Sequence, residues 1–110
     1  MHWRIQELHK NELLLTLMNY NLEFVSEAFK EWKALDNTIR KQLKKKLAER
    51  LLEPHVSASR LTGSSNHYKI KLRNAGFRLV YEVIDAEVVV LVVAVGKRER
   101  NAVYKAAAKR

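Results

Sequence analysis

The sequence predicts an α+β fold: a small, mainly antiparallel sheet with an N-terminal helical hairpin before it and a C-terminal helix after it. Three observations predict this order. Before Pro54, the only proline of the chain, apolar residues recur at the spacing of amphipathic helices. Beyond it, apolar and charged residues alternate with the period of two typical of half-buried strands. From Arg98 to Lys109 a weak helical pattern returns.

The first 17 residues differ from the rest of the chain. Their charges cancel, so the whole net charge of +9 lies in residues 18–110. Ile5, Leu8 and the leucines of 13–17 form a weak helical stripe without a clear cap. We interpret residues 1–17 as an N-terminal extension or alternative-start segment, with Met18 as the second start, and residues 18–110 as the folded domain. A genuine extra helix in this segment is the alternative.

The domain begins with a strand and a helix. Tyr20, Leu22 and Phe24 alternate with polar residues, which predicts a short half-buried strand. Ser26 to Leu35 then carries apolar residues at helical spacing, and Ser26 is the expected N-cap.

A second helix is expected from Thr38 to Glu53. Its apolar residues recur every fourth position, at Ile39, Leu43, Leu47 and Leu51. Asp36–Thr38 breaks the first helix and supplies a second cap signal, and Pro54 prevents continuation. The short link predicts an antiparallel helical hairpin.

The second half of the chain predicts three strands. After a loop over residues 55–66, the strand around Tyr68–Arg73 is expected to turn at Asn74–Gly76 into the strand Phe77–Ile84. Asp85-Ala86 links it to Glu87–Val95, whose almost wholly apolar run predicts the central, most buried strand. Gly96 is expected to end this strand, and the C-terminal helix follows from Arg98.

The composition excludes several classes of protein. A chain of 110 residues favours one compact domain. The absence of cysteine excludes disulfide scaffolds, thiolate metal sites and a cysteine nucleophile. No apolar run approaches the roughly 20 residues that span a bilayer, and no secretory signal is recognisable. We therefore expect a cytoplasmic protein that does not contact membranes.

The charge indicates the class of partner. With Lys+Arg 21 against Asp+Glu 12, a small domain this basic usually binds a polyanion such as nucleic acid, through phosphate contacts. A merely soluble basic protein, or a partner of an acidic protein, is the alternative.

Conventional catalytic and metal-binding patterns are sparse. Glu82, Asp85 and Glu87 cluster around a turn, where acidic residues are common, and the histidines follow no ligand spacing. A two-histidine ribonuclease site made of His55 and His67 is conceivable, but neither residue is expected on a rigid element. We expect no metal ion and no other cofactor.

A basic strand face is the most distinctive feature. Lys69, Lys71 and Arg73 project from one strand, and Arg78 lies on its hairpin partner. Cross-strand neighbours lie roughly 5 Å apart, so these like charges crowd and an anion would offset them. An ordinary solvated sheet face is the alternative. The predicted second helix carries a further basic face, made of Arg40, Lys41, Lys44, Lys45 and Lys46.

These segments closely resemble the bacterial RelE toxins of the RelE/ParE toxin–antitoxin superfamily. The resemblance covers residues 18–110 and rests on Tyr68–Arg73, Gly76–Tyr81, and Val95–Arg100 with Val103-Tyr104. Glu31-Trp32 and the helix Arg40–Leu47 are similar to the family as well. The joint presence of both lysines, both arginines and the tyrosine is the specific part of the pattern.

The resemblance implies a ribosome-dependent endoribonuclease that cuts the mRNA codon in the vacant aminoacyl site and so inhibits translation. It carries the family's active-site residues onto Lys69, Lys71, Arg78, Arg98 and Tyr104. Phe77 departs from the family, whose members often have tyrosine there. The expected RNA-binding residues are Arg40, Lys41, Lys44, Lys45, Lys46, Arg73 and Phe77.

Cleavage by this route needs the 2′-hydroxyl to lose a proton and attack its own phosphate. A lysine can accept that proton only if its pKa is lowered, and neighbouring cations lower it, so Lys71 or Lys69 is the expected base. Arg78 suits the phosphorane oxygens. Arg98 is expected to stabilise the leaving group, although family mechanisms often name it the proton donor. Tyr104 stacks on a base, orients the nucleotide or donates a proton.

The resemblance also implies the partners. A RelB-type antitoxin with an acidic, amphipathic tail would wrap the toxin, and operator DNA would be contacted only indirectly through the antitoxin. A ParE-like toxin that inhibits DNA gyrase without nuclease chemistry is the main alternative. A basic nucleic-acid-binding module without activity and a relic toxin are the others.

Overall fold

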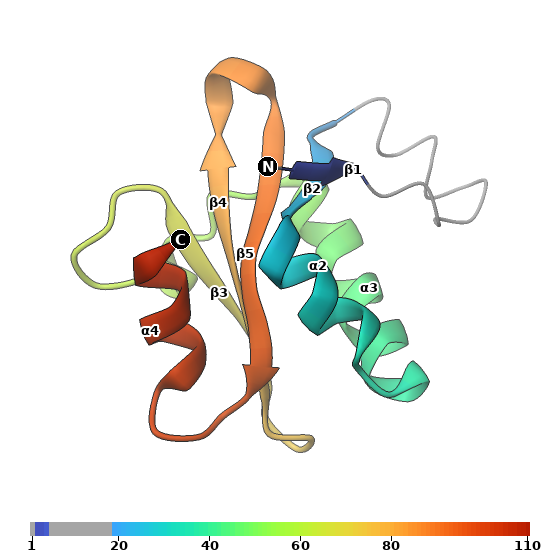
Figure 1. The fold of residues 1–110 in the computed structure, drawn as a ribbon. Coiled ribbons are helices and arrows are strands. Elements are labelled where there is room, and N and C mark those ends of the chain that lie inside the picture. Colours follow the sequence, from blue (N-terminus) through green and yellow to red (C-terminus); the bar gives the residue numbers. More distant parts are fainter. Residues whose placement is uncertain (1, 5–18) are drawn as a thin grey trace.

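The computed structural model describes residues 2–4 and 19–110 (Figure 1). Its strands are β1 (His2–Arg4), β2 (Asn21–Val25), β3 (His67–Leu72), β4 (Phe77–Ile84) and β5 (Val89–Lys97). Its helices are α2 (Ser26–Lys33), α3 (Asn37–Leu52) and α4 (Ala102–Lys109), with single 3₁₀ turns at Ser57–Ser59 and Asp85–Glu87. The predicted α+β class is confirmed. Every described helix is too short or too polar to cross a membrane.

The five strands form one mixed sheet in the order β1-β2-β5-β4-β3. The neighbours β1–β2, β3–β4 and β4–β5 are antiparallel, and β2 runs parallel to β5. The sheet is thus mainly antiparallel, as predicted, with one parallel pair that the sequence pattern did not reveal. The apolar strand β5 lies at the centre, also as predicted.

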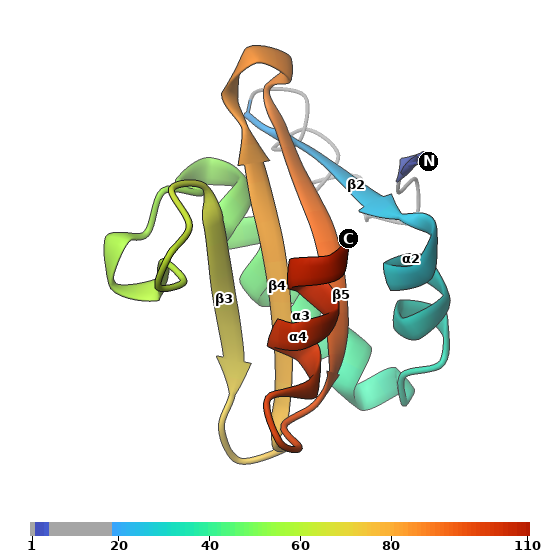
Figure 2. The same cartoon turned by 60° about the vertical axis from the view of Figure 1, so that its left-hand side comes forward.

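Helices cover both faces of the sheet. The side chains of α2 and α3 pack on one face, in a core with Phe24, Tyr68 and Val92. Helix α4 packs on the other face (Figure 2). Its Val103 and Ala107 side chains form a cluster there with Val80 and Val93. Because β5 is buried from both sides, it cannot alternate with polar residues, which explains its valine-rich sequence.

Helix α3 forms as its leucine spacing predicts. Leu43, Leu47 and Leu51 are buried against the sheet. The Asp36 carboxylate caps the helix by accepting a hydrogen bond from the Thr38 backbone N–H at 3.0 Å. The helix begins one residue before the predicted start and ends one residue before the predicted end.

Two predicted boundaries, at Ser26 and at Gly96, are wrong. Ser26 is not an N-cap: Val25, the last residue of β2, holds that position without a side-chain hydrogen bond, because the strand runs directly into α2. Gly96 does not end β5. It pairs with Arg78, and the strand continues to Lys97. A Cβ atom at Gly96 would lie 3.4 Å from Val103 Cγ2, in van der Waals contact with α4.

The C-terminal helix begins at Ala102 rather than Arg98. Residues 98–101 form a turn in which Arg100 and Asn101 have positive φ values of 50° and 59°. The Arg98 N–H donates to the Gly76 carbonyl at 2.7 Å, which ties this turn to the β3–β4 turn. A backbone engaged with a distant turn cannot continue a helix at the same residues, and sequence spacing does not reveal that contact.

The C-terminal end of α4 is tied to α2 by a bidentate ion pair. Arg110 donates to both carboxylate oxygens of Glu31, at 2.8 and 3.0 Å, and to the Val93 carbonyl at 3.0 Å. Glu31 also accepts from the Val95 N–H at 3.2 Å. Strand β2 pairs with β5 only as far as Val92. The Glu31–Arg110 ion pair therefore satisfies backbone groups of β5 beyond that point, at Val93 and Val95.

The N-terminal prediction falls mostly outside the described residues. His2–Arg4 form β1 and pair antiparallel with β2, with Trp3 opposite Phe24. The predicted helical stripe from Ile5 to Leu17 and the second start at Met18 lie outside the part of the chain that the structure describes.

Candidate active site and RNA interface

The β3–β4 hairpin presents the predicted cations on the face that α4 covers. Along β3 the apolar residues are buried on the α3 side, so Lys69 and Lys71 point to the opposite side. Lys71 lies directly opposite Arg78, and Lys69 opposite Val80, whose side chain packs with α4. The strand alternation that the sequence predicts is confirmed.

Arg78 is a buried cation that has no carboxylate partner among the described residues. Its residue is only 5% exposed, and its guanidinium donates to the adjacent Phe77 carbonyl at 2.9 Å. Within the described part of the chain, no acidic side chain forms an ion pair with it. Burial of an uncompensated charge is costly, and the charge is offset if a ligand brings an anion. The position therefore suits a phosphate.

Lys71 is chemically distinct among the lysines here. The neighbouring Lys69 ammonium lowers its pKa most, followed by partial desolvation and by the charges of Arg73, Arg78 and Arg98. More of the neutral amine is therefore present near neutral pH than in an ordinary lysine. A neutral amine can accept a proton, which fits the general-base role that the sequence left open between two lysines.

Arg98 and Tyr104 join this site from the far end of β5 and from α4. Arg98 is exposed in the turn held by Gly76, and its charge acts on Lys71. Tyr104 lines a cavity of about 680 Å³ together with Lys69 and Lys71. The structure thus brings together the five residues predicted as catalytic: Lys69, Lys71, Arg78, Arg98 and Tyr104.

The same cavity extends past the lysines to three polar residues that the sequence analysis did not assign to this site. Ser64, His67 and Glu82 line it. His67 was expected off any rigid element, yet it is the first residue of β3. The alternation of side chains along β3 could have indicated this position, because His67, Lys69 and Lys71 all lie on one face of the strand. Glu82 lies directly opposite His67 on β4.

Only some of the predicted RNA-binding residues lie near this site. Lys46 and Arg73 line two shallow grooves of about 360 and 410 Å³ beside Lys71, at the open edge of β3. The remaining lysines on α3 lie away from the cavity: Lys41 and Lys45 are exposed, and Lys44 is half-buried.

Arg40 and Phe77 occupy structural positions. The Arg40 guanidinium donates to the carbonyls of Trp32, Lys33 and Leu35 at 3.1–3.4 Å, which caps the C-terminal end of α2. Phe77 packs against the core on the α3 side, so strand alternation turns it away from Arg78. Neither residue is brought to the cavity.

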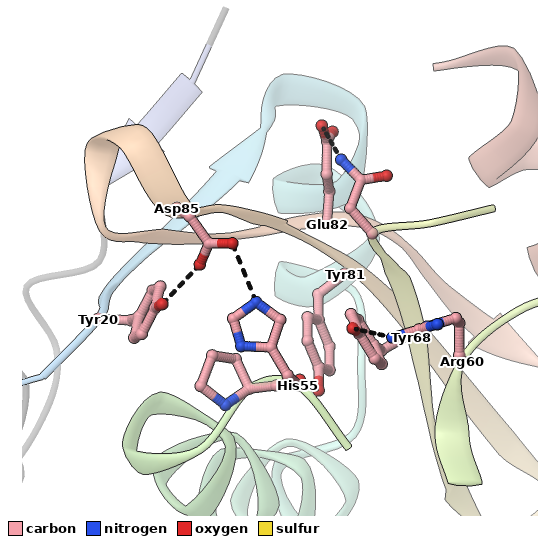
Figure 3. Close-up of polar contacts among 9 residues, drawn as sticks. Tyr20, His55, Arg60, Tyr68, Tyr81, Glu82 and Asp85 are labelled. Atoms are coloured by element: carbon pink, nitrogen blue, oxygen red, sulfur yellow. Dashed lines mark hydrogen bonds and ion pairs between the residues drawn. The ribbon is translucent and has the colours of Figure 1, made fainter. Parts of the chain in front are cut away.

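The structure does not bring His55 and His67 together. His55 Nε2 lies 3.1 Å from Asp85 Oδ2, and the Tyr20 hydroxyl donates to the other carboxylate oxygen at 2.6 Å (Figure 3). The His55 ring also meets the edge of Tyr68, which is buried on the α3 side. Since His67 lines the α4 side, the two histidines cannot act on one phosphate. No metal-binding cluster of carboxylates and histidines occurs within residues 2–4 and 19–110.

Comparison with known proteins gives a consistent result. Residues 22–102 match the family model of the ParE toxin of the type II toxin–antitoxin system parDE. The mRNA interferase toxin RelE of Escherichia coli K12 is 56% identical over 93 residues, which cover 84% of this chain and 98% of that protein. A putative RelE-like toxin protein of E. coli is 50% identical over the same coverage.

Solved structures agree with the sequence relatives. An arginine-to-alanine double mutant of E. coli toxin RelE in the free state superposes with a TM-score of 0.79 and 54% identity, over 84% of this chain and 98% of that one. RelE in the intact E. coli RelBE toxin–antitoxin complex gives a TM-score of 0.70 at 54% identity, over 74% of this chain and 99% of that one.

Proposed function

The chain belongs to the RelE/ParE family of type II toxins and is an mRNA interferase toxin of the RelE type, and we propose that it cuts mRNA in the aminoacyl site of the ribosome. The relative at 56% identity is the mRNA interferase toxin RelE and the one at 50% is a putative RelE-like toxin, which favours nuclease chemistry over the gyrase-binding alternative.

One observation supports the chemistry most strongly: the buried Arg78 lies opposite Lys71 and has no acidic partner among the described residues. A phosphate over this pair would compensate the buried charge. It would also place the adjacent ribose beside a lysine whose pKa is lowered. A protein that only binds another protein needs neither feature.

The mechanism follows from these positions. The neutral Lys71 amine takes the proton of the 2′-hydroxyl, and the resulting 2′-oxygen attacks the adjacent phosphorus. Arg78 donates to the phosphorane oxygens through its planar guanidinium. The bond from phosphorus to the 5′-oxygen then breaks, which leaves a 2′,3′-cyclic phosphate and a 5′-hydroxyl end.

Arg98 and Tyr104 act on the leaving side and on the base. Arg98 is exposed and permanently charged, so it stabilises the leaving oxygen electrostatically rather than by giving up its own proton. Tyr104 lines the cavity and stacks on a nucleotide base there. The proton for the leaving oxygen comes from the Tyr104 hydroxyl or from water.

Ribosome dependence follows from the weakness of this set on its own. The five catalytic residues include no carboxylic acid and no histidine, and free RNA must be oriented by the protein alone. A ribosome that fixes the codon supplies that orientation, which is worth several kcal/mol. Lys46 and Arg73 would contact RNA phosphates at the β3 edge, and the exposed lysines of α3 would extend the contact.

The antitoxin and the cellular setting complete the proposal. RelE of E. coli has been solved in complex with its antitoxin, as the intact complex and with an antitoxin peptide. We expect a RelB-type antitoxin with an acidic segment for this chain, and operator contact only through that antitoxin. The toxin domain comprises residues 18–110, residues 1–17 are an appended segment, and the protein acts in the bacterial cytoplasm.

Primer extension on a defined mRNA tests the proposal, with programmed ribosomes present or absent. Cuts at the aminoacyl-site codon are expected only with ribosomes, and Arg98→Ala and Tyr104→Ala should strongly weaken them. Lys105→Ala, an exposed position on α4, is the matched control and should cut normally. If the protein is toxic to cells yet no lane shows cuts, the nuclease proposal is wrong and gyrase assays replace it.

A further inference from the structure

Lys71 lies where three open spaces on the surface of the protein meet. It lines the cavity of about 680 Å³ beside α4, and it also lines both grooves, of about 360 and 410 Å³, at the edge of β3. The residue is only half-buried. A small molecule can therefore reach the Lys71 amine from more than one direction, without RNA or a ribosome to carry it there.

The surroundings of Lys71 attract small anions. Four cations act on it from three elements: Lys69 and Arg73 of β3, Arg78 of β4, and Arg98 of the turn after β5. Within residues 2–4 and 19–110, none of these four forms an ion pair with a carboxylate. Clustered charges of one sign raise the local concentration of ions of the opposite sign, so a phosphate dianion is drawn to this point.

The same four charges make the Lys71 amine reactive. They lower its pKa, with Lys69 as the largest cause, so more of the amine is neutral near neutral pH than in an ordinary lysine. A neutral amine has a free lone pair and attacks carbonyl carbon, whereas an ammonium group does not. The position thus combines an attraction for phosphate with a nucleophile.

We propose that Lys71 is a modification site for small acyl phosphates, in which a phosphate is joined to a reactive carbonyl. The phosphate group binds at Arg78 and its neighbouring cations, which places the carbonyl carbon beside Lys71 Nζ. The amine attacks this carbon, and the bond from carbon to the bridging phosphate oxygen breaks. The nitrogen loses one proton to the departing phosphate, so the products are an amide at Lys71 and hydrogenphosphate.

Acylation at this position inactivates the site. The amide nitrogen is neither basic nor charged, so a modified Lys71 cannot take the proton of the 2′-hydroxyl. This consequence rests on the proposed function, whereas the modification itself does not. An acyl phosphate would therefore silence the toxin without any antitoxin.

Incubation of the purified protein with acetyl phosphate tests the proposal, with tandem mass spectrometry to measure the acetylation rate at each lysine. Lys71 should react roughly tenfold faster than Lys69, because only Lys71 faces a buried arginine. Lys69 is a matched internal control, since it lies on the same strand face, lines the same cavity and is equally half-buried. Arg78→Met should reduce the Lys71 rate to about that of Lys69, and Lys97→Met should leave it unchanged.

A second reagent separates phosphate binding from the reactivity of the amine. The N-hydroxysuccinimide ester of acetic acid acetylates amines but carries no phosphate. Arg78→Met should slow its reaction with Lys71 several-fold less than it slows the reaction with acetyl phosphate. Equal losses with the two reagents would show that Arg78 does not hold the phosphate, and the proposal would be wrong.

The remaining outcomes separate the modification site from the nuclease function. Equal rates at Lys71 and Lys69 with acetyl phosphate refute the site, even if the protein cuts mRNA on ribosomes. If Lys71 is preferred but the unmodified protein makes no cuts, the site stands and the nuclease function is refuted. If both stand, cutting should fall in proportion to the fraction of Lys71 that is acetylated. Undiminished cutting by fully acetylated protein overturns the inactivation.

Discussion

Lys71 and Arg78 lie directly opposite each other in the β3–β4 hairpin, and Arg78 is buried there without an acidic partner among the described residues. Two positive charges thus face each other, one of them buried, and neither charge is stabilised by its surroundings. Such an arrangement is retained when the charges act on a ligand, so stability and function are expected to oppose each other at this point.

Arg78→Met should therefore stabilise the protein and inactivate it. Methionine has a similar length and removes the cost of burying an unpaired charge, so the free energy of unfolding should rise by about 1 kcal/mol or more. Cleavage on ribosomes should fall roughly 100-fold or more, because the phosphorane loses its donor. Urea unfolding and single-turnover cleavage measure the two effects. Lys97→Met, at an exposed position on β5, should change neither.

The pH dependence of cleavage should depend on Lys69. Its ammonium is the largest cause of the lowered pKa of Lys71. Lys69→Met should raise the Lys71 pKa toward its ordinary value, so the rising limb of the pH–rate profile should move to higher pH. Single-turnover cleavage measured across pH checks this, with Lys105→Met as the control. A lower rate with an unmoved limb would show that Lys71 is not the base.

The same lowered pKa has a consequence for stability. The folded state binds a proton at Lys71 less readily than the unfolded chain does. The free energy of unfolding should therefore rise with pH, from the lowered pKa of Lys71 up to the pKa of an ordinary lysine. Lys71→Met should flatten this part of the stability profile in urea titrations at each pH. An unchanged slope in the variant would contradict the pKa shift.

Tyr104 can be tested with two substitutions that separate its roles. If the ring stacks on a base, Tyr104→Phe should retain most activity and Tyr104→Ala should lose about 10- to 100-fold. If the hydroxyl supplies the proton to the leaving oxygen, both variants should lose activity alike. Single-turnover rates at saturating ribosome concentration distinguish the two results.

The Glu31–Arg110 ion pair should hold α4 over the cavity. Glu31→Gln weakens a bidentate pair that also supports the β5 backbone, so amide hydrogen exchange in α4 should become about tenfold faster. Glu27→Gln is the matched control, since Glu27 lies 3.9 Å from Arg110 Nε and is largely exposed. Equal exchange rates in both variants would show that packing alone positions the helix.

The Tyr20 hydroxyl should control the titration of Asp85. Its hydrogen bond is the main cause of the lowered pKa of that carboxyl, with His55 as a further donor. The stability that this interaction adds is present above the ordinary aspartate pKa and is lost as the pH falls through the lowered value. Tyr20→Phe should raise the Asp85 pKa, as measured by carbon NMR of the carboxyl signal. An unchanged titration would contradict this account.

Local patterns predicted most of the fold. The leucines of α3 and the alternation in β3 each reflect one buried face, which spacing along the chain reveals directly. The errors arose where distant segments decide the outcome. Arg98 lies in a turn because its N–H bonds Gly76, and Gly96 stays in a strand because it pairs with Arg78.

The residues of the site also fall into two groups, those that local patterns predict and those that distant contacts position. Lys69, Lys71 and Arg78 share a face because of strand parity and hairpin register, so their meeting could be predicted. Arg40 was grouped with the basic face of α3, but its contacts with α2 carbonyls depend on the turn between the helices. Glu82 and His67 line the cavity only because α4 forms its other wall, and that packing does not follow from spacing along the chain.

The parallel pairing of β2 with β5 has a consequence for the order in which the protein is made. Synthesis delivers β2 early and its partner β5 last among the described strands, with more than sixty residues between them. The sheet therefore cannot close around its central strand until the C-terminal third of the chain is available. Arg98 and Tyr104 follow β5 and are added later still. A nascent chain that ends before Tyr104 thus holds no complete site, however much of the sheet it has already formed.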